Sequence, residues 1–301
     1  MPPRPHILVV NGRKVRQPVF IIGAPHSGAD LLARALKCSP GFHMTIGQPS
    51  VMSVAHAFAR SPSIQHGREA TATVLRDAFA QAWQVTPHGC LGCSAACREA
   101  GGVKGAASCV AERDIRRYGD ATPDLMYCAE GLVDAFPEAR LVQIIRDGRD
   151  VVAGMLADNE LLRWFKPGVA NVDSEFPNPF FGIETEADLA AWPDLSVAGK
   201  CAMRWRGSVR TAARLRSSMP AETLTTLRYE EVIRQPAAAV RTVSGFIGAD
   251  VAPIGVRTRG RGAVGSTAIA AGSWRRRLTP QQVTDVERVA GLDLRRVGYG
   301  A

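Results

Sequence analysis

Apolar residues along the chain alternate between short continuous runs and longer stretches with helical spacing. The short runs, rich in β-branched and aromatic residues, predict strands at 19–22, 141–145 and 224–228. Apolar positions three or four residues apart predict helices at 30–37, 70–83, 124–135, 149–157, 201–218, 230–247 and 280–291. Strands that alternate with helices are typical of an α/β fold of three layers, in which helices flank a central parallel sheet.

The length of the chain indicates a single domain over 1–301. Its 301 residues, of which 46% are hydrophobic, are sufficient for one sizeable core. Two segments lack regular periodicity: a cysteine-rich insert at about 86–112 and a long loop at about 158–200. Because long loops on a rigid scaffold often carry specificity, we expect segments 41–110 and 158–200 to lie over the ligand edge of the sheet. A packed connection with aromatic anchors is the alternative for 158–200.

The first predicted strand runs through a glycine-bracketed loop into a helix. Val19 to Ile22 form the apolar run, Gly23 and Gly28 bracket the loop, and Leu31 begins the helical pattern. The free amides of such a loop, together with the helix N-terminus, hold anions well. The segment therefore predicts a P-loop-like phosphate cradle.

The residues after Gly28 argue against magnesium-dependent nucleotide hydrolysis. In the loop G-x-x-x-x-G-K-[ST], Lys neutralises phosphate and the hydroxyl holds Mg²⁺, whereas Ala29 and Asp30 occupy those positions here. We therefore expect the bound anion to need no metal, and a kinase-like phosphotransferase is the least favoured interpretation.

Together with a second motif, this loop resembles the sulfotransferases that use 3′-phosphoadenosine 5′-phosphosulfate (PAPS), particularly the bacterial group. The second motif, ARLVQIIRDGRDVVAGML at 139–156, resembles the family's strand and helix for the donor's 3′-phosphate. Segments at 119–140, 203–220, 226–236 and 272–300 extend the resemblance over most of the chain. It implies an enzyme that moves a sulfuryl group from PAPS to a hydroxyl or amine of a small-molecule acceptor.

The resemblance assigns the donor site residue by residue. His26 stands at the family's basic position, where an imidazolium would donate to the bridging oxygen of the leaving group, and we take it as the catalytic residue. Ser27 and the amides around Gly28 would hold the 5′-phosphosulfate, and Arg146, at a strand end, would bind the 3′-phosphate. An ion pair of Arg146 with Asp147 or Asp150 is the alternative. The remaining cofactor-binding positions are Gly23, Ala29, Asp30, Gly154, Arg228, Trp274 and Arg275.

Several of these positions depart from the family pattern. Ala29 and Asp30 replace a threonine pair, Gly154 replaces a serine, and Ala121 replaces the lysine of G-D-K-T-P. Gln48 stands where many bacterial members carry a Glu proposed as general base. Other candidates for the base, chosen by residue type and rough location, are His43, His56 and Glu184. A catalytically inactive nucleotide-binding protein that acts as a regulatory partner therefore stays open as an alternative function.

The insert contains four cysteines in a C-x2-C-x3-C-x11-C array: Cys90, Cys93, Cys97 and Cys109. Closely spaced thiols of this kind suit a structural zinc ion, and the segment has little large apolar content to order it otherwise. An iron–sulfur cluster, free thiols and two disulfides remain alternatives. We expect Cys38, Cys128 and Cys201 to be lone buried thiols without chemistry.

Charge and hydropathy narrow the range of partners. The net charge of +9 favours anionic ligands, but the basic residues are scattered and lack interleaved aromatic residues, which argues against nucleic-acid binding. The longest early apolar run, Ile7 to Val10, is too short for a signal peptide, and no later stretch approaches a membrane span. These features predict a cytoplasmic protein, while the oligomeric state remains open.

Overall fold

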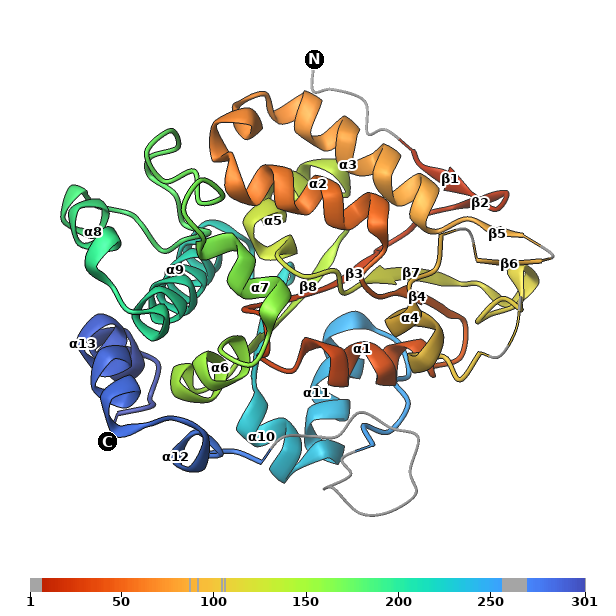
Figure 1. The fold of residues 1–301 in the computed structure, drawn as a ribbon. Helices are drawn as coiled ribbons and strands as arrows, with labels where there is room; N and C mark the ends of the chain where they lie inside the picture. Colours follow the sequence, from red (N-terminus) through yellow and green to blue (C-terminus); the bar gives the residue numbers. More distant parts are fainter. Residues whose placement is uncertain are drawn as a thin grey trace.

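A computed structural model describes residues 7–300 except 87, 91, 104, 106 and 256–269 (Figure 1). Its centre is a five-stranded parallel sheet with the strand order β4-β7-β3-β8-β9. The strands are β3 (Val19–Gly23), β4 (Phe42–Thr45), β7 (Arg117–Asp120), β8 (Arg140–Ile145) and β9 (Leu224–Arg228). The predicted α/β fold with a parallel sheet flanked by helices is therefore confirmed.

Two short antiparallel pairs accompany the sheet, β1 (Val9–Val10) with β2 (Arg13–Lys14) and β5 (Val85–Thr86) with β6 (Gly89–Cys90). The α-helices are α1 (Ala29–Lys37), α2 (Pro49–Arg60), α3 (Arg68–Ala82), α4 (Ala95–Ala100), α5 (Ala129–Ala135), α6 (Gly148–Met155), α7 (Asn159–Leu162), α8 (Glu186–Ala191), α9 (Val197–Ser218), α10 (Tyr229–Arg234), α11 (Pro236–Ile247), α12 (Trp274–Arg277) and α13 (Pro280–Arg296). Short 3-10 helices lie at Pro62–His66, Glu112–Asp114, Leu125–Cys128, Arg163–Phe165 and Trp192–Asp194. None of the described helices is long and apolar enough to cross a membrane.

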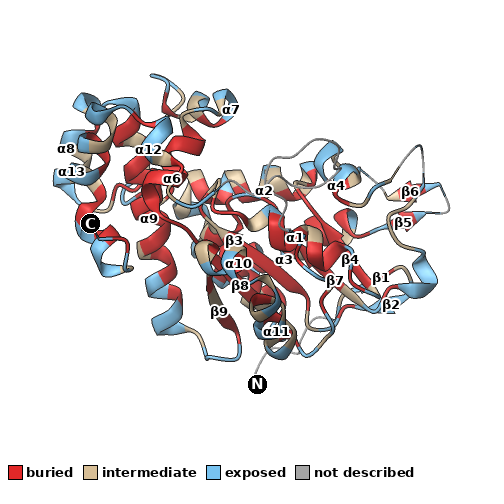
Figure 2. Cartoon of the chain, turned by 90° about the horizontal axis from the view of Figure 1, so that it is seen from below, coloured by how far each residue is buried: buried red, intermediate tan, exposed pale blue. Residues whose placement is uncertain are grey.

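The pleat of β3 explains the layers. Side chains alternate across a strand, so Phe20 and Ile22 pack on the side of α2, α3 and α5, whereas Val19 and Ile21 pack on the side of α1 and α11. Both faces are covered, and the central strands are buried (Figure 2). A continuous apolar run without alternation, such as 19–22, is what a doubly covered parallel strand requires.

Several elements were not predicted: β4 and β7 of the central sheet, the four short strands outside it, and the helices α2, α4, α7, α8 and α12. Some helix boundaries also differ from the sequence prediction. β4 and β7 were not predicted, because His43, Thr45, Gly119 and Asp120 interrupt their apolar pattern and are buried only by neighbouring elements. The helix expected at 230–247 is two helices, since Pro236 begins α11. The helix expected at 124–135 is a 3-10 turn followed by α5.

The segment 158–200 is not a long loop. It contains α7, α8, two 3-10 helices and the first turn of α9, and Asp158 and Thr185 cap the starts of α7 and α8. Phe180 and Phe181 are fully buried and pack edge to face in a second core with α6, α9 and α13. The aromatic residues therefore anchor a packed connection.

The lone thiols agree with the prediction at two positions of three. Cys128 and Cys201 are buried, but Cys38 is exposed. The last residue of α1 is Lys37, and Cys38 caps the helix on the solvent side.

A glycine in α9 provides a test of the packing against segment 179–182. A Cβ atom at Gly207 would overlap the carbonyl oxygen of Pro179, whereas one at Gly245, in α11, would meet open space. The backbone of segment 179–182 can move away from a new side chain only at a cost in free energy. We therefore expect Gly207→Ala to lower the free energy of unfolding by about 1–3 kcal/mol. Gly245→Ala should raise it by about 0.5–1 kcal/mol. Urea unfolding of both variants measures this, and equal effects would contradict the close approach.

Candidate functional site

A cavity of about 380 Å³ lies at the carboxyl edge of the parallel sheet. The chain leaving each of the five strands contributes to its wall, as expected for a ligand site in an open α/β sheet. The α4 helix of the cysteine-rich insert adds Ala96. The strand-end residues are Gly23–His26 and Gly28–Asp30 after β3, Ile46 and Gly47 after β4, Ala121–Pro123 after β7, Arg146 after β8, and Tyr229 after β9.

The loop between β3 and α1 is shaped by Gly28. Its φ of 97° lies in the left-handed region, and a Cβ atom there would overlap the ring of Tyr229. Tyr229 therefore packs directly on the loop. No side chain in the described part of the chain caps the first amides of α1. These amides and the positive end of the helix dipole favour an anion at this point.

His26 lines the cavity with a left-handed backbone, φ 62°. Its Nε2 atom lies 3.1 Å from Oδ2 of Asp158, immediately before α7. Burial lowers the pKa of His26 below its ordinary value, and the nearby Asp158 carboxylate opposes this shift without reversing it. The imidazole is therefore held in place and largely neutral at neutral pH in the free protein.

Gly154 makes room for that ring. A Cβ atom at Gly154 would lie 2.7 Å from both Cβ and Cγ of His26. The absence of a side chain on α6 is thus a packing requirement of His26, and Gly154 itself does not line the cavity in the described structure.

Arg146 contacts three other residues of the site. Its guanidinium lies 4.1 Å above the centre of the Tyr229 ring, and Nη1 donates a hydrogen bond of 3.3 Å to the carbonyl of His26. Nη2 lies 3.7 Å from Oδ2 of Asp150, so the ion pair expected as an alternative is formed. The residue is only 3% exposed, yet it lines the cavity. Arg146 therefore brings a buried positive charge to the same space as the loop.

Other predicted cofactor residues lie behind or beside this cavity. Ser27 is buried behind the loop, and within the described residues its hydroxyl has no hydrogen-bond partner. Arg228 packs on the ring of Tyr299 and donates to the carbonyls of Val297 and Gly298.

Trp274 and Arg275 stack on each other at α12. The amide of Trp274 donates to Asp150, the ion-pair partner of Arg146. The structure thus places Gly23, His26, Gly28, Ala29, Asp30 and Arg146 around the cavity. The other predicted positions do not line it among the described residues.

None of the candidate bases lines the cavity in the described structure. His43 lies inside β4 next to Cys109, and His56 is paired with the buried Asp124 at 3.4 Å. Glu184 forms ion pairs with Arg210 and Arg214.

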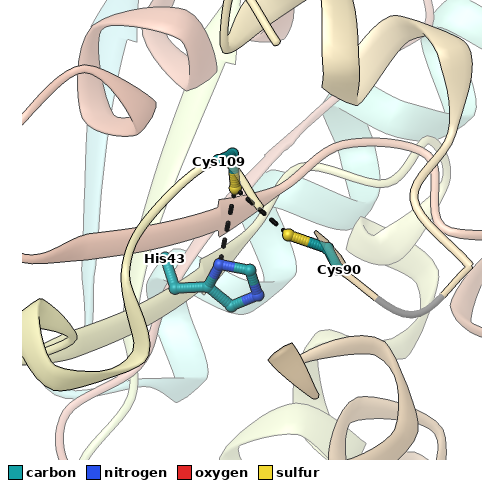
Figure 3. Close-up of side chains that lie close together, drawn as sticks. All are labelled: His43, Cys90 and Cys109. Carbon is teal, nitrogen blue, oxygen red and sulfur yellow. Dashed lines mark hydrogen bonds between the residues drawn. The ribbon is translucent and has the colours of Figure 1, made fainter. Parts of the chain in front are cut away.

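The cysteine array gathers beside β4. Sγ of Cys109 lies 3.5 Å from Sγ of Cys90 and 3.7 Å from Nδ1 of His43, and these three donor atoms form one compact group (Figure 3). Cys93 contacts Cys90 and Cys97. Sequence spacing predicted the four cysteines but gave no sign that His43, far earlier in the chain, would join two of them.

Asp120, at the end of β7, was not predicted as a site residue. It is fully buried, and burial raises its pKa to about 7. The Thr45 hydroxyl lies 2.5 Å from Oδ2 of Asp120 and 3.1 Å from the carbonyl of Gly119. One hydroxyl hydrogen cannot serve both oxygens, but a protonated Asp120 can donate to Thr45, which then donates to Gly119.

Two more residues escaped the sequence analysis. Tyr229 follows Arg228 in the quoted R-Y-E-E-V segment, and its role depends on the tertiary contact with Gly28. Asp158 lay at the start of the segment expected to be a loop. Its position before a helix was the only available signal, because Asp is a favoured helix-capping residue.

Comparisons with known proteins show which family the chain is similar to. A family model described as "Sulfotransferase family" matches residues 18–176. A search of curated proteins gave no match. A sulfotransferase crystal structure from Alicyclobacillus acidocaldarius aligns with 92% of this chain and 96% of its own, at 18% identity and a TM-score of 0.42.

Two further solved structures are similar in the same way. A mouse sulfotransferase complexed with PAP aligns over 93% of this chain and 85% of its own, at 14% identity and a TM-score of 0.42. The sulfotransferase STF9 from Mycobacterium avium aligns over 96% and 79%, at 12% identity and a TM-score of 0.46.

The raised pKa of Asp120 predicts a pH-dependent contribution to stability. Because the folded state binds this proton more tightly than the unfolded state, Asp120 stabilises the fold at acid pH and loses this effect as pH rises from about 4 to about 7. Asp120→Asn, whose amide can donate to Thr45 at every pH, should remove the dependence.

Urea unfolding of both proteins at pH 5 and pH 8 measures this effect. The stability of the wild type relative to Asp120→Asn should fall by a few kcal/mol between the two pH values, at about 1.4 kcal/mol per pKa unit. A constant difference would mean that Asp120 is ionised throughout.

Proposed function

Because this chain belongs to the sulfotransferase family, whose model matches more than half of its residues, we propose that it transfers a sulfuryl group from PAPS to a small-molecule hydroxyl or amine. The observation that carries the proposal is one cavity that the anion-binding loop and the buried Arg146 share. The loop amides would bind the 5′-phosphosulfate, and Arg146 would bind a second phosphate group of the donor.

The loop fits a donor that needs no magnesium. Ala29 offers no hydroxyl for Mg²⁺, and the carboxylate of Asp30, which lines the cavity, carries the wrong charge for a phosphate contact of its own. Backbone amides, the helix dipole and one arginine would therefore hold the anion. An in-line transfer requires few further protein groups at the donor, because the donor already carries an activated sulfuryl group.

His26 is positioned for the leaving group. In the transfer, the bond between sulfur and the bridging phosphate oxygen breaks, a bond from sulfur to the acceptor oxygen or nitrogen forms, and negative charge collects on the bridging oxygen. An imidazolium in the loop would donate a hydrogen bond to that oxygen and stabilise the charge. The bound anion would itself favour protonation of His26, and Asp158 would fix the orientation of the ring.

The remaining wall of the cavity suits a small apolar acceptor. Ile21, Ile46, Ala96, Ala121 and Pro123 line it and present no charge. In the described structure none of His43, His56 and Glu184 lines the cavity, so an acceptor that loses its proton easily, such as a phenol or an amine, lowers the demand for a strong base.

Titration calorimetry with 3′-phosphoadenosine 5′-phosphate, the desulfated donor, tests the site. We expect micromolar binding without magnesium and no comparable binding of ATP with magnesium. Arg146→Gln should weaken binding by about 10- to 150-fold, because a charge-assisted hydrogen bond contributes about 1.5–3 kcal/mol. Arg68→Ala removes an equal charge from an 80% exposed side chain of α3 and should change nothing.

A near-UV circular dichroism spectrum shows whether Arg146→Gln keeps its tertiary packing. If the folded wild type does not bind the desulfated donor, or if Arg146→Gln binds it equally well, the proposed donor site is wrong. Donor binding without transfer to any of a panel of phenols and amines would instead favour the regulatory role.

The pH dependence of donor binding tests the role of His26. Because the pKa of His26 in the free protein lies below its ordinary value of about 6.5, the proposed imidazolium in the complex requires proton uptake on binding, and affinity should rise as pH falls from 7.5 to 6. His26→Asn retains a residue that tolerates a left-handed backbone but cannot be protonated.

The affinity of the wild type should therefore change with pH more steeply than that of His26→Asn, by up to about tenfold per pH unit. The variant controls for titration of the ligand's own phosphates. Parallel pH profiles would show that His26 carries no charge in the complex.

A further inference from the structure

The cysteine-rich insert packs against the edge of the sheet through very little apolar surface. Among the described residues of 86–112, only Gly89, Cys97 and Ala100 are buried. Burial of apolar surface stabilises a segment of this composition only slightly. Another interaction must therefore hold it in one conformation. Its side chains converge instead on the group of His43, Cys90 and Cys109 (Figure 3).

The spacing of these donor atoms matches that of ligands around one ion. Two ligands on a tetrahedral zinc ion lie about 3.8 Å apart when both are sulfur, and about 3.6 Å apart when one is nitrogen. The observed separations are 3.5 Å between Cys90 and Cys109, and 3.7 Å between Cys109 and Nδ1 of His43. The sulfur pair is too far apart for a disulfide bond, which requires about 2.05 Å.

The buried ammonium of Lys37, next to the cysteine sulfur atoms, also favours a metal site. Lys37, only 7% exposed, donates to the carbonyl of Met44 at 2.7 Å and to the sulfur atoms of Cys97 and Cys109 at 3.1 and 3.2 Å. A neutral thiol is a weak acceptor, whereas a thiolate accepts strongly. A buried ammonium aimed at two sulfurs therefore suits thiolates, and several adjacent thiolates need a divalent cation to be stable together. Hydrogen bonds to ligand sulfur of this kind are typical around metal sites.

We propose that this group is a structural zinc site with His43, Cys90 and Cys109 as ligands and Cys93, whose side chain lies near Cys90 and Cys97 just outside the group of three, as the fourth. Cys97 lies outside the coordination sphere, where it accepts a hydrogen bond from Lys37. The set contains three thiolates and one imidazole, a common composition of closed structural zinc sites.

The site also supports the wall of the cavity. Ala96, between Cys93 and Cys97, lines the cavity, and the hydroxyl of Ser94 donates to the carbonyl of Ile46 at 2.5 Å. Ile46 belongs to the cavity wall that follows β4. Zinc that fixes Cys90 and Cys93 would therefore fix Ser94 and Ala96, whatever ligand the cavity takes.

Metal analysis of the full chain, purified under reducing conditions without chelator, tests the proposal. We expect about one zinc ion per chain and no iron or sulfide. Cys90→Ser, Cys109→Ser and His43→Gln should each lose the tightly bound ion, whereas Cys97→Ser and the exposed Cys38→Ser should keep it. Cys93→Ser should also weaken metal binding, and excess cobalt should give this variant thiolate charge-transfer bands about one third weaker than those of the wild type, because one of three thiolates is removed.

The outcomes separate the alternatives. If Cys97→Ser loses the metal and His43→Gln keeps it, the four cysteines are the ligands and the assignment of His43 is wrong. Absence of stoichiometric zinc, or iron accompanied by sulfide, overturns the proposal.

Hydrogen exchange of the wild type before and after chelation needs no variant. We expect faster exchange confined to the insert and β4, with β3 and β8 still protected. Unchanged exchange after removal of the metal would overturn the structural role.

Discussion

The buried ion pair between Arg146 and Asp150 is the interaction on which the site depends. Two charges this deeply buried are tolerated only when further hydrogen bonds satisfy them. Loss of one partner leaves the other as an uncompensated buried charge. Asp150 also accepts hydrogen bonds from the amides of Gly272 and Trp274 and from the Ser273 hydroxyl. The carbonyl of Arg146 in turn accepts from the indole of Trp205. One ion pair thus joins the end of β8 to α6, α9 and the segment that leads into α12.

The sequence predicted those parts of the molecule that local patterns determine. The β3 strand, its loop and α1 follow one another within 19 residues, and Arg146 ends an apolar strand, so both were found. The β4 and β7 strands are polar and short, and only their neighbours bury them. The stacking of Arg146 on Tyr229 and the approach of His43 to Cys109 join residues 83 and 66 positions apart, and no local spacing contains that information.

The departures from the family pattern are partly explained by one another. His26 and Gly154 are separated by more than 120 residues, yet the imidazole occupies the volume that a side chain at 154 would need. The two positions therefore form one packing unit, in which an imidazole at this place in the loop requires a residue without a side chain on α6. Changes that seem independent along the chain, and that suggested a degraded site, describe a single rearranged contact between the loop and the helix.

The insert has a second consequence for the sheet. β4 is an edge strand, and the unpaired carbonyls of an edge can recruit a strand from another molecule. Here the carbonyl of Met44 is occupied by Lys37, and that of Ile46, just beyond the strand, by Ser94. Figure 1 shows α4 beside this edge. Lys37 and the same segment that completes the cavity wall therefore occupy carbonyls at this edge that another strand would need for pairing.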